Sequence, residues 1–133
     1  MTQAPLKIAV VSQYFYPENF IINDIVRELS ALGVHVEVFT GKPNYPGGEV
    51  FPGYTANDPV EDRFADTVTV HRAPLRPRKH GGAKNLILNY LSFVANGVKY
   101  FRRHAKRSKF DIYFVFAPSP IISVIPALAM KRV

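Results

Sequence analysis

Several side chains able to bind a hydroxylated or anionic ligand lie in one short loop near the N-terminus. They follow residues 8–11, an apolar and mostly β-branched run that predicts a strand buried on both faces, as in a parallel α/β sheet. An amphipathic helix is predicted to begin just after them. Ligands of open α/β sheets bind beyond the carboxyl ends of the strands, beside helix N-termini whose free N–H groups favour anions. The candidate residues in this loop are Gln13, Tyr14, Glu18 and Asn19.

Two further loops should meet the first at the same edge of the sheet. They follow predicted strands at 34–40 and 111–116, and parallel strands place their carboxyl ends together. Their amide, amine, hydroxyl and phenol groups would add donors, acceptors and an aromatic face suited to a polyhydroxylated, partly charged ligand. The residues that they contribute are Lys42, Asn44, Tyr45 and Ser119.

The common catalytic and cofactor motifs are absent. No glycine precedes Gly33, so the first strand-to-helix turn lacks the G-x-G-x-x-G pattern of nicotinamide-binding sites. The sequence also has no P-loop, no G-x-S-x-G nucleophile elbow and no cysteine. The four histidines are scattered with no acid beside them, so spacing predicts no metal site. These absences exclude most simple enzyme classes, and we expect neither a metal nor a cofactor.

The order of predicted elements is typical of an α/β domain. The pattern reads strand, helix, strand, long loop, strand, helix, strand and helix, which implies a mostly parallel sheet with right-handed crossovers. We expect Asn19 to cap the first helix and His35 to point outward from its strand. Besides 8–11, the predicted elements are helices at 21–32 and 83–106, strands at 34–40, 67–71 and 111–116, the loop 41–59, and a last helix that runs to Val133.

Length and composition limit the chain to one domain, residues 1–133, with 47% hydrophobic residues for a core. The N-terminus is too polar for a signal peptide, and no apolar stretch reaches the roughly 20 residues of a membrane-spanning helix. We therefore expect a cytoplasmic protein, attached at most to a membrane surface. A sheet of only four strands would leave its edges bare, so we also expect the domain to be part of a larger protein.

The net charge of +7 is unevenly distributed along the chain. Residues 1–71 carry four Lys or Arg and nine Asp or Glu, whereas residues 72–109 carry eleven Lys or Arg and no acid. Such a block attracts phosphates on lipid headgroups, nucleotides or nucleic acid.

The predicted helix at 83–106 has two interpretations. It is either a core helix whose basic end complements its dipole, or a helix that also faces an anionic membrane. Its predicted buried stripe consists of Ile87, Tyr90, Leu91, Val94, Val98 and Phe101.

Specific segments of the chain resemble family 4 glycosyltransferases, in particular the subgroup that builds colanic acid, capsule and O-antigen polysaccharides of the bacterial cell envelope. The similar segments cover nearly the whole chain. They are VVSQYFYPENF followed two residues later by ND, then ELSALG, VEVFTGKPNYPGG, RAPLRPRK and FAPSP. Two departures stand out. The family often has Gly-His where this chain has Gly33 and Val34, and often has a histidine where this chain has Pro118 and Ser119.

The resemblance implies the N-terminal, acceptor-binding half of a GT-B fold, a Rossmann-like three-layer domain that faces a second domain across a cleft. The C-terminal domain would bind the nucleotide-sugar donor and carry the family's E-x7-E element. No two glutamates of this chain have that spacing. The implied reaction is metal-independent hexosyl transfer with retention, to a sugar or lipid-linked sugar acceptor. The chain alone would then be inactive.

Under this resemblance, the rim residues named above would line the acceptor side of the cleft. Glu18 could act directly or serve as a local capping or ion-pair residue, and we expect Glu18→Gln and Lys42→Ala to cut transfer with little change in thermal stability. Basic residues after the third predicted strand would hold the domain against an anionic inner membrane or a lipid pyrophosphate. These are Arg72, Arg76, Arg78, Lys79 and Lys84.

Two other functions remain open at the level of sequence. One is a non-catalytic Rossmann-like module that binds a nucleotide or sugar phosphate. The other is a nucleic-acid binder that uses the basic block, although no nucleic-acid motif accompanies that charge and we expect no nucleic-acid partner.

Overall fold

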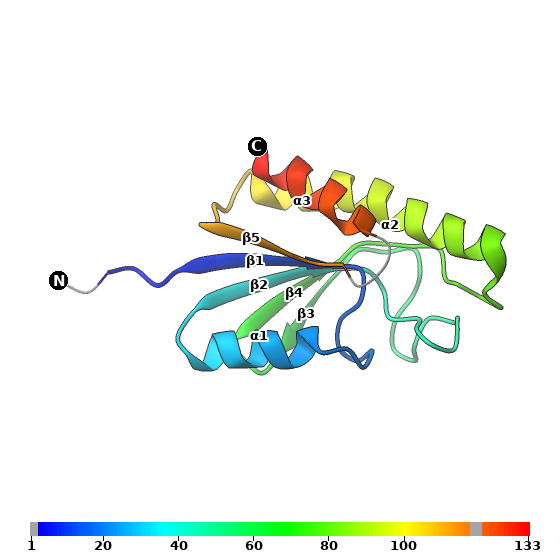
Figure 1. Cartoon of the computed structure of the whole chain (residues 1–133), viewed down its shortest axis with the longest axis horizontal. Helices are drawn as coiled ribbons and strands as arrows, with labels where there is room; N and C mark the ends of the chain where they lie inside the picture. Colours follow the sequence, from blue (N-terminus) through cyan, green and yellow to red (C-terminus); the bar gives the residue numbers. More distant parts are fainter. Residues whose placement is uncertain (1–2, 118–120) are drawn as a thin grey trace.

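The computed structural model describes residues 3–117 and 121–133. Within these residues, five strands and three α-helices follow one another (Figure 1). In chain order they are β1 (Lys7–Ser12), α1 (Ile22–Ala31), β2 (His35–Thr40), β3 (Val60–Phe64), β4 (Val68–Arg72), α2 (Gly82–Ala105), β5 (Ile112–Phe116) and α3 (Val124–Lys131), with a short 3-10 turn η1 (Ile121–Ser123) before α3.

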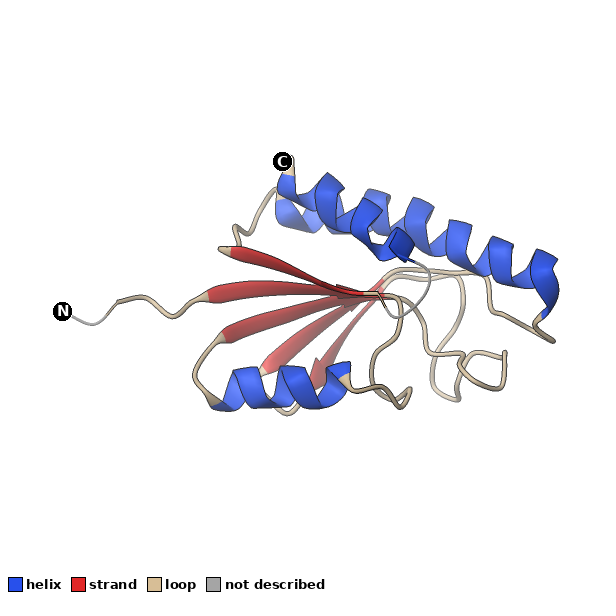
Figure 2. Cartoon of the chain, in the orientation of Figure 1, coloured by secondary structure: helices blue, strands red, loops and turns tan. Residues whose placement is uncertain are grey.

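The domain has three layers, with one sheet between two helical layers (Figure 2). The strand order is β3-β4-β2-β1-β5, and β4, β2, β1 and β5 are parallel. Helix α1 covers one face of the sheet, whereas α2 and α3 cover the other (Figure 1). This arrangement confirms the predicted Rossmann-like α/β fold with a mostly parallel sheet.

The sheet has five strands rather than the four that the sequence predicted. The additional strand, β3, pairs antiparallel with β4 through a turn in which Ala65 and Asp66 adopt positive φ angles of 49° and 61°. Neither residue is the glycine or asparagine that usually signals such a turn. The strand itself, VEDRF, carries three charges and buries only Phe64, so its edge position hides it from a search for apolar runs.

Each face of the sheet has its own hydrophobic core. On the α1 face, Ile8 and Val10 of β1 pack with Ile22 and Val26 of α1. On the α2 face, Val11 and Phe39 pack with Phe93, Phe101 and Met130. Strand β1 therefore contributes to both cores, as its unbroken apolar sequence predicted.

The buried stripe of α2 differs from the predicted one. The helix buries Asn89, Phe93, Gly97, Phe101 and Ala105, whereas Ile87 and Leu91 are 54% and 58% exposed. Counting apolar residues missed this face because it includes an asparagine and a glycine. Gly97 allows α3 to pack closely, since a Cβ there would lie 3.0 Å from the Pro126 ring.

The start of α1 also differs from the prediction. The helix begins at Ile22 with Ile21 in the N-cap position, and no side chain caps it. Asn19 is exposed and lies before this position, so the predicted cap is wrong.

His35 is exposed at the start of β2, as predicted. Among the described residues, none of the helices is both long and apolar enough to cross a membrane.

Candidate functional site at the carboxyl edge of the sheet

The loops after β1, β2 and β4 leave the sheet at one edge, where both α1 and α2 begin (right side of Figure 1). We call this edge the rim. It consists of residues 13–21, 41–59 and 73–81. The loops predicted to converge after β1 and β2 do so. The third predicted contributor, Ser119, lies outside the described residues.

Glu18 joins the first two rim loops through its side chain. One carboxylate oxygen accepts hydrogen bonds from the backbone N–H groups of Asn44 and Tyr45, at 3.1 and 2.9 Å. The other accepts from the N–H of Phe15 at 3.3 Å. Glu18 is only 1% exposed. Both of its oxygens are engaged with backbone, so Glu18 positions the loops and does not project into solvent.

Burial raises the pKa of Glu18 from its ordinary 4.5 to about 7. The hydrogen bonds from Asn44, Tyr45 and Phe15 and the charge of Arg72 act in the opposite direction and limit the rise. A carboxyl group with this pKa changes its protonation near neutral pH. The charge of the Glu18 carboxyl group at neutral pH therefore depends on its burial in the folded domain.

Asn23 fixes the shape of the loop that carries Glu18. Its side-chain oxygen accepts from the N–H of Tyr16 at 2.8 Å, and its amide donates to the carbonyl of Glu18 at 2.8 Å. Sequence reasoning missed this residue because it lies in the first turn of α1, where an asparagine gives no sign that it folds back. The one sequence signal for Asn23 was its place in the ND pair of the segment that resembles family 4 glycosyltransferases.

Arg72 connects the first two rim loops and β3 through its side chain. Its guanidinium donates to the carbonyls of Gly41, at 3.1 Å, and Tyr16, and lies 3.5 Å from the carboxylate of Asp62 in β3. Arg72 is 2% exposed. The prediction that it contacts a membrane or phosphate at the surface is therefore wrong, because its charge is used inside the domain.

Lys42 is a buried cation at the rim. It is 0% exposed, and within residues 3–117 and 121–133 its Nζ has no hydrogen-bond partner. Burial lowers its pKa, with Asp58 opposing and Arg72 adding to the effect. A buried ammonium without a partner is energetically costly. It is the kind of group that a bound anion or hydroxyl would satisfy.

Arg78 lies among three tyrosines. Its guanidinium carbon is 5.2, 5.0 and 5.6 Å from the ring centres of Tyr14, Tyr45 and Tyr90. It also donates to the hydroxyl groups of Tyr14 and Tyr90. Burial raises the pKa of Tyr14 to about 12, so its phenol stays protonated at neutral pH. This cluster unites the first two loops, the 73–81 segment and α2.

A chain of amide hydrogen bonds connects the rim to α2. Gln13 donates to Asn89 at 2.7 Å, and Asn89 donates to the carbonyl of Arg76 at 2.6 Å. Asn44 accepts from the N–H of Arg78 at 3.1 Å. Asn89 and Tyr90 were not predicted as site residues, because on α2 they look like ordinary helix positions.

The predicted binding residues divide by exposure. Gln13, Tyr14, Glu18, Lys42 and Asn44 are each less than 5% exposed, so they form the inner support of the rim. Tyr45 is 37% exposed. Asn19, Arg76, Lys79 and Lys84 are also exposed.

A cavity of about 520 Å³ opens at the 73–81 side of the rim, between that segment, residues 56–57 and α2. Its size is within the range of about 300–1,000 Å³ that small-molecule sites occupy. Arg76 and Lys79 are the predicted binding residues that line it. The rest of its lining mixes polar side chains, such as Asn57, Ser92 and Asn96, with apolar and aromatic ones, such as Leu75 and Tyr100.

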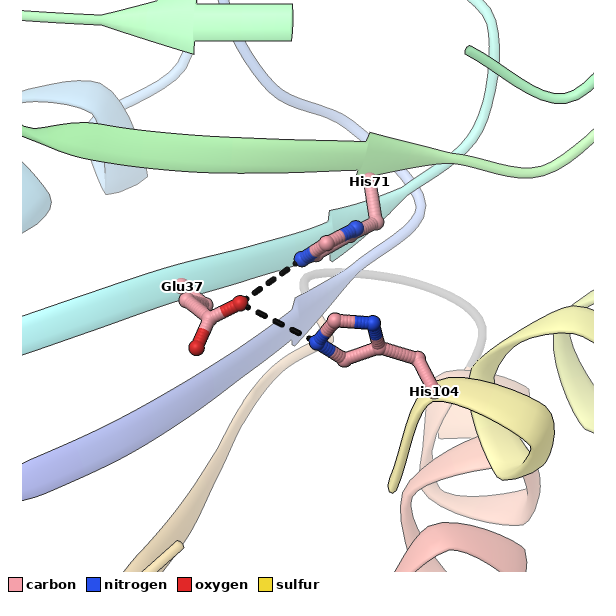
Figure 3. A group of neighbouring side chains, drawn as sticks. All are labelled: Glu37, His71 and His104. Atoms are coloured by element: carbon pink, nitrogen blue, oxygen red, sulfur yellow. Dashed lines mark hydrogen bonds and ion pairs between the residues drawn. The ribbon is translucent and has the colours of Figure 1, made fainter. Parts of the chain in front are cut away.

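A second polar cluster lies under α2, away from the rim (Figure 3). Glu37 of β2 accepts hydrogen bonds from His71 of β4 and His104 of α2. The sequence-based view of the histidines as isolated from any acid is therefore wrong. His71 and His104 lie 34 and 67 positions after Glu37 in the chain. The three meet only because β4 lies next to β2 and α2 crosses that face. These three side chains could hold a metal ion.

Comparison with protein families agrees with this architecture. No curated protein gives a significant match to the chain. A family model described as "Glycosyl transferase 4-like domain" matches residues 19–133, which include most of the rim and all of α2. The match covers well over half of the chain, and the chain belongs to the glycosyl transferase 4-like domain family.

Proposed function

We propose that this chain is the acceptor-side domain of a retaining glycosyltransferase that uses a nucleotide sugar to build a bacterial cell-surface polysaccharide. Family membership supports a transferase with sugar donor and acceptor substrates. Retention, the colanic acid, capsule or O-antigen pathway, and a second domain that binds the donor are parts of the proposal that come from the resemblance of the sequence. No step of the proposed transfer requires a metal or a cofactor.

The observation that carries the proposal is the buried Lys42 of the polar rim, whose Nζ has no hydrogen-bond partner among residues 3–117 and 121–133. A sugar hydroxyl or an acceptor phosphate would provide such a partner. Glu18 and Arg72 hold the surrounding loops through backbone hydrogen bonds, so the rim is preformed. Tyr45 and Arg78 would present an aromatic face and a cation to the acceptor.

The proposal includes a peripheral association with the inner face of the plasma membrane. Positions 84, 87, 91, 95, 99 and 102 of α2 and its C-cap residue Lys106 recur every three or four residues, so they share one face, and all are exposed. This face combines Ile87 and Leu91 with Lys84, Lys99, Arg102 and Lys106. An exposed apolar and basic helix face is the pattern that binds anionic lipid surfaces. It would place the rim near a lipid-linked acceptor.

A transfer assay with the full-length protein tests the proposed reaction. UDP- and GDP-activated sugars would be incubated with lipid-linked saccharide acceptors, and release of nucleoside diphosphate would be measured with and without acceptor. We expect acceptor-dependent release from at least one donor, and NMR of the product should show the anomeric configuration of the donor. Binding of nucleotide sugar without any transfer would instead identify a non-catalytic binding module, and an inverted product would refute retention.

A further inference from the structure

The cluster under α2 brings three metal-ligating groups from three separate elements to one point. The Nε2 atoms of His71 and His104 donate to the same carboxylate oxygen of Glu37, at 2.8 and 3.2 Å (Figure 3). All three ligand atoms lie within 4.8 Å of one another. His104 lies in the last turn of α2, the end of the helix opposite the rim (Figure 1). The three side chains make none of the rim contacts described above, although the cavity beside them also borders Pro59 and Arg72.

We propose that Glu37, His71 and His104 bind a Zn²⁺ ion that clamps the end of α2 onto β2 and β4. The inference is independent of the proposed transfer reaction, which takes place at the rim. Two imidazoles and one carboxylate are a donor set that Zn²⁺ uses in proteins, with a fourth position left for water or another ligand. The ion would replace the two hydrogen bonds that now hold the cluster together.

The spacing of the ligand atoms is close to that of a zinc site. Bonds of about 2.0–2.2 Å at tetrahedral angles would separate the ligand atoms by about 3.3–3.5 Å. The two N···O distances, 2.8 and 3.2 Å, already lie near this range. His104 is near the end of its helix and its side chain is 32% exposed, so it can adjust with little disturbance of the core.

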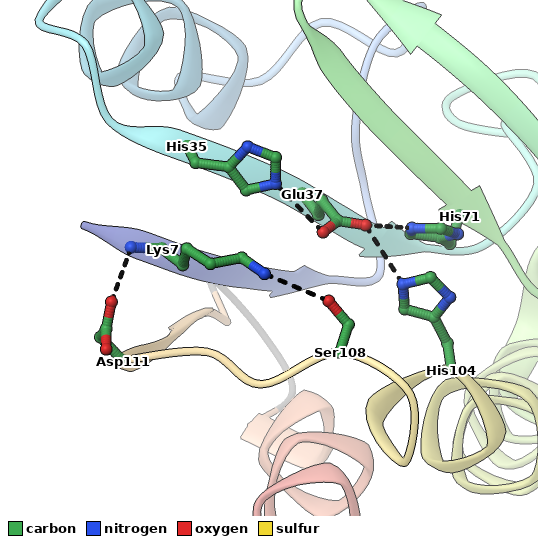
Figure 4. Close-up of polar contacts among 7 residues, drawn as sticks. All are labelled: Lys7, His35, Glu37, His71, His104, Ser108 and Asp111. Carbon is green, nitrogen blue, oxygen red and sulfur yellow. Dashed lines mark hydrogen bonds and ion pairs between the residues drawn. The ribbon is translucent and has the colours of Figure 1, made fainter. Parts of the chain in front are cut away.

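Neighbouring side chains hold the ligands in place. The ring of Phe39 stacks on His71, with centres 4.7 Å apart and planes at 18°, and its centre lies 5.5 Å from that of His104. The second oxygen of Glu37 accepts from His35 at 3.3 Å (Figure 4). Partners of this kind orient the ligands of metal sites. The proposed ligands are therefore oriented before any ion binds.

The fourth coordination position would face a cavity. A space of about 230 Å³ adjoins the cluster, and both histidines line it together with Glu61, Arg103 and Arg107. Water can reach a metal ion through this opening. The two arginines would also favour an anion as the fourth ligand.

Zinc titration of the metal-stripped protein tests the proposal. The full-length protein would be treated with a chelator, dialysed, and titrated with Zn²⁺ by calorimetry, and its melting temperature would be recorded with and without the ion. We expect one equivalent to bind with micromolar or tighter affinity and to raise the melting temperature. Co²⁺ in place of Zn²⁺ should give the visible absorption of a four-coordinate site.

Three variants identify the ligands, and one provides a matched control. His71→Gln, His104→Gln and Glu37→Gln should each weaken Zn²⁺ binding by at least about tenfold and abolish the Co²⁺ absorption. His80→Gln changes an exposed histidine outside the cluster and should leave both unchanged. His104→Gln is the most informative variant, because His104 is the most exposed of the three ligands and its replacement should disturb folding least.

Either of two results would overturn the proposal. One is the absence of stoichiometric binding to the folded wild-type protein. The other is a pattern of variant affinities that does not depend on the cluster. Wild-type affinity in His104→Gln, or an equal loss of affinity in His80→Gln, would show that Zn²⁺ binds to other histidines.

Discussion

Glu18 connects two rim loops, and replacing it tests how far the rim depends on a single side chain. Glu18→Gln keeps the shape but replaces one accepting oxygen with a donor that faces backbone N–H groups. Because these hydrogen bonds are buried, we expect a loss of stability of about 1–3 kcal/mol in thermal or urea unfolding, in place of the small change expected from the sequence. Glu28→Gln, at an exposed position of α1, is the control. Equal stability of the two variants would show that the Glu18 hydrogen bonds contribute little.

The same carboxyl group predicts a pH dependence of stability. Its pKa is about 7 in the folded chain, above the ordinary 4.5, so the folded state binds this proton more tightly. The stability that Glu18 contributes is fully present below about pH 4.5 and is lost as the pH rises through about 7. The difference in stability between wild type and Glu18→Gln should therefore shrink from pH 5 to pH 8, on the order of 2–3 kcal/mol. A constant or growing difference would contradict the raised pKa.

Replacing Lys42 should change stability and acceptor binding in opposite directions. Lys42→Met keeps an unbranched side chain but removes a buried ammonium that has no partner in the described residues. We expect the free protein to become more stable by about 1–2 kcal/mol, while the KM for acceptor rises. Lys131→Met, at an exposed position of α3, should change neither. A Lys42→Met protein of unchanged stability and full activity would remove Lys42 from the site.

At the residue scale, the sequence predicted which loops form the rim, but it did not predict what each side chain does there. Residue types and loop positions placed Glu18, Lys42 and Asn44 at one rim, where the structure finds them. Their burial was not predictable, because it depends on how the 41–59 loop folds back over the first loop. Arg72 was misplaced for the same reason, since only the fold brings the carbonyls of Gly41 and Tyr16 to its guanidinium.

The next scale is that of the elements, where Gly48 controls how two rim loops pack. Its φ is +89°, its N–H donates to the carbonyl of Asn44 at 2.7 Å, and its carbonyl accepts from Lys79 at 2.7 Å. A Cβ there would collide with the backbone carbonyl of Lys79. We expect Gly48→Ala to cost roughly 1–3 kcal/mol of stability. Gly47→Ala, where a Cβ meets nothing within 4 Å, should be nearly neutral in the same unfolding experiment.

Elements with a strong apolar pattern were predictable, and those without one were not. The parallel strands β1, β2 and β5 and the helix α1 appear within one residue of their predicted bounds. Strand β3 was not predicted, because most of its residues are charged and the turn after it lacks glycine. The buried face of α2 was misjudged because packing against α3 selects Gly97, a contact that periodicity cannot reveal.

At the scale of the whole molecule, the exposed face of α2 predicts selective membrane binding. We expect the protein to bind vesicles that contain phosphatidylglycerol, with affinity that falls as salt rises, and to bind neither neutral phosphatidylcholine vesicles nor duplex DNA. Replacing both Ile87 and Leu91 with serine should weaken vesicle binding, because these side chains are exposed and apolar. Sedimentation with vesicles measures this. Comparable binding to DNA would instead favour a nucleic-acid partner.

The central claim is that the rim holds the acceptor, and the kinetics of Arg78→Lys test it most directly. Lysine keeps the charge but loses the planar group that lies among Tyr14, Tyr45 and Tyr90. Arg63→Lys, at an exposed position of β3 outside the rim, is the matched control. In the full-length protein, Arg78→Lys should raise the KM for acceptor about tenfold while the KM for donor and the activity of Arg63→Lys stay near wild type. An unchanged acceptor KM, or a change confined to the donor, would contradict the account.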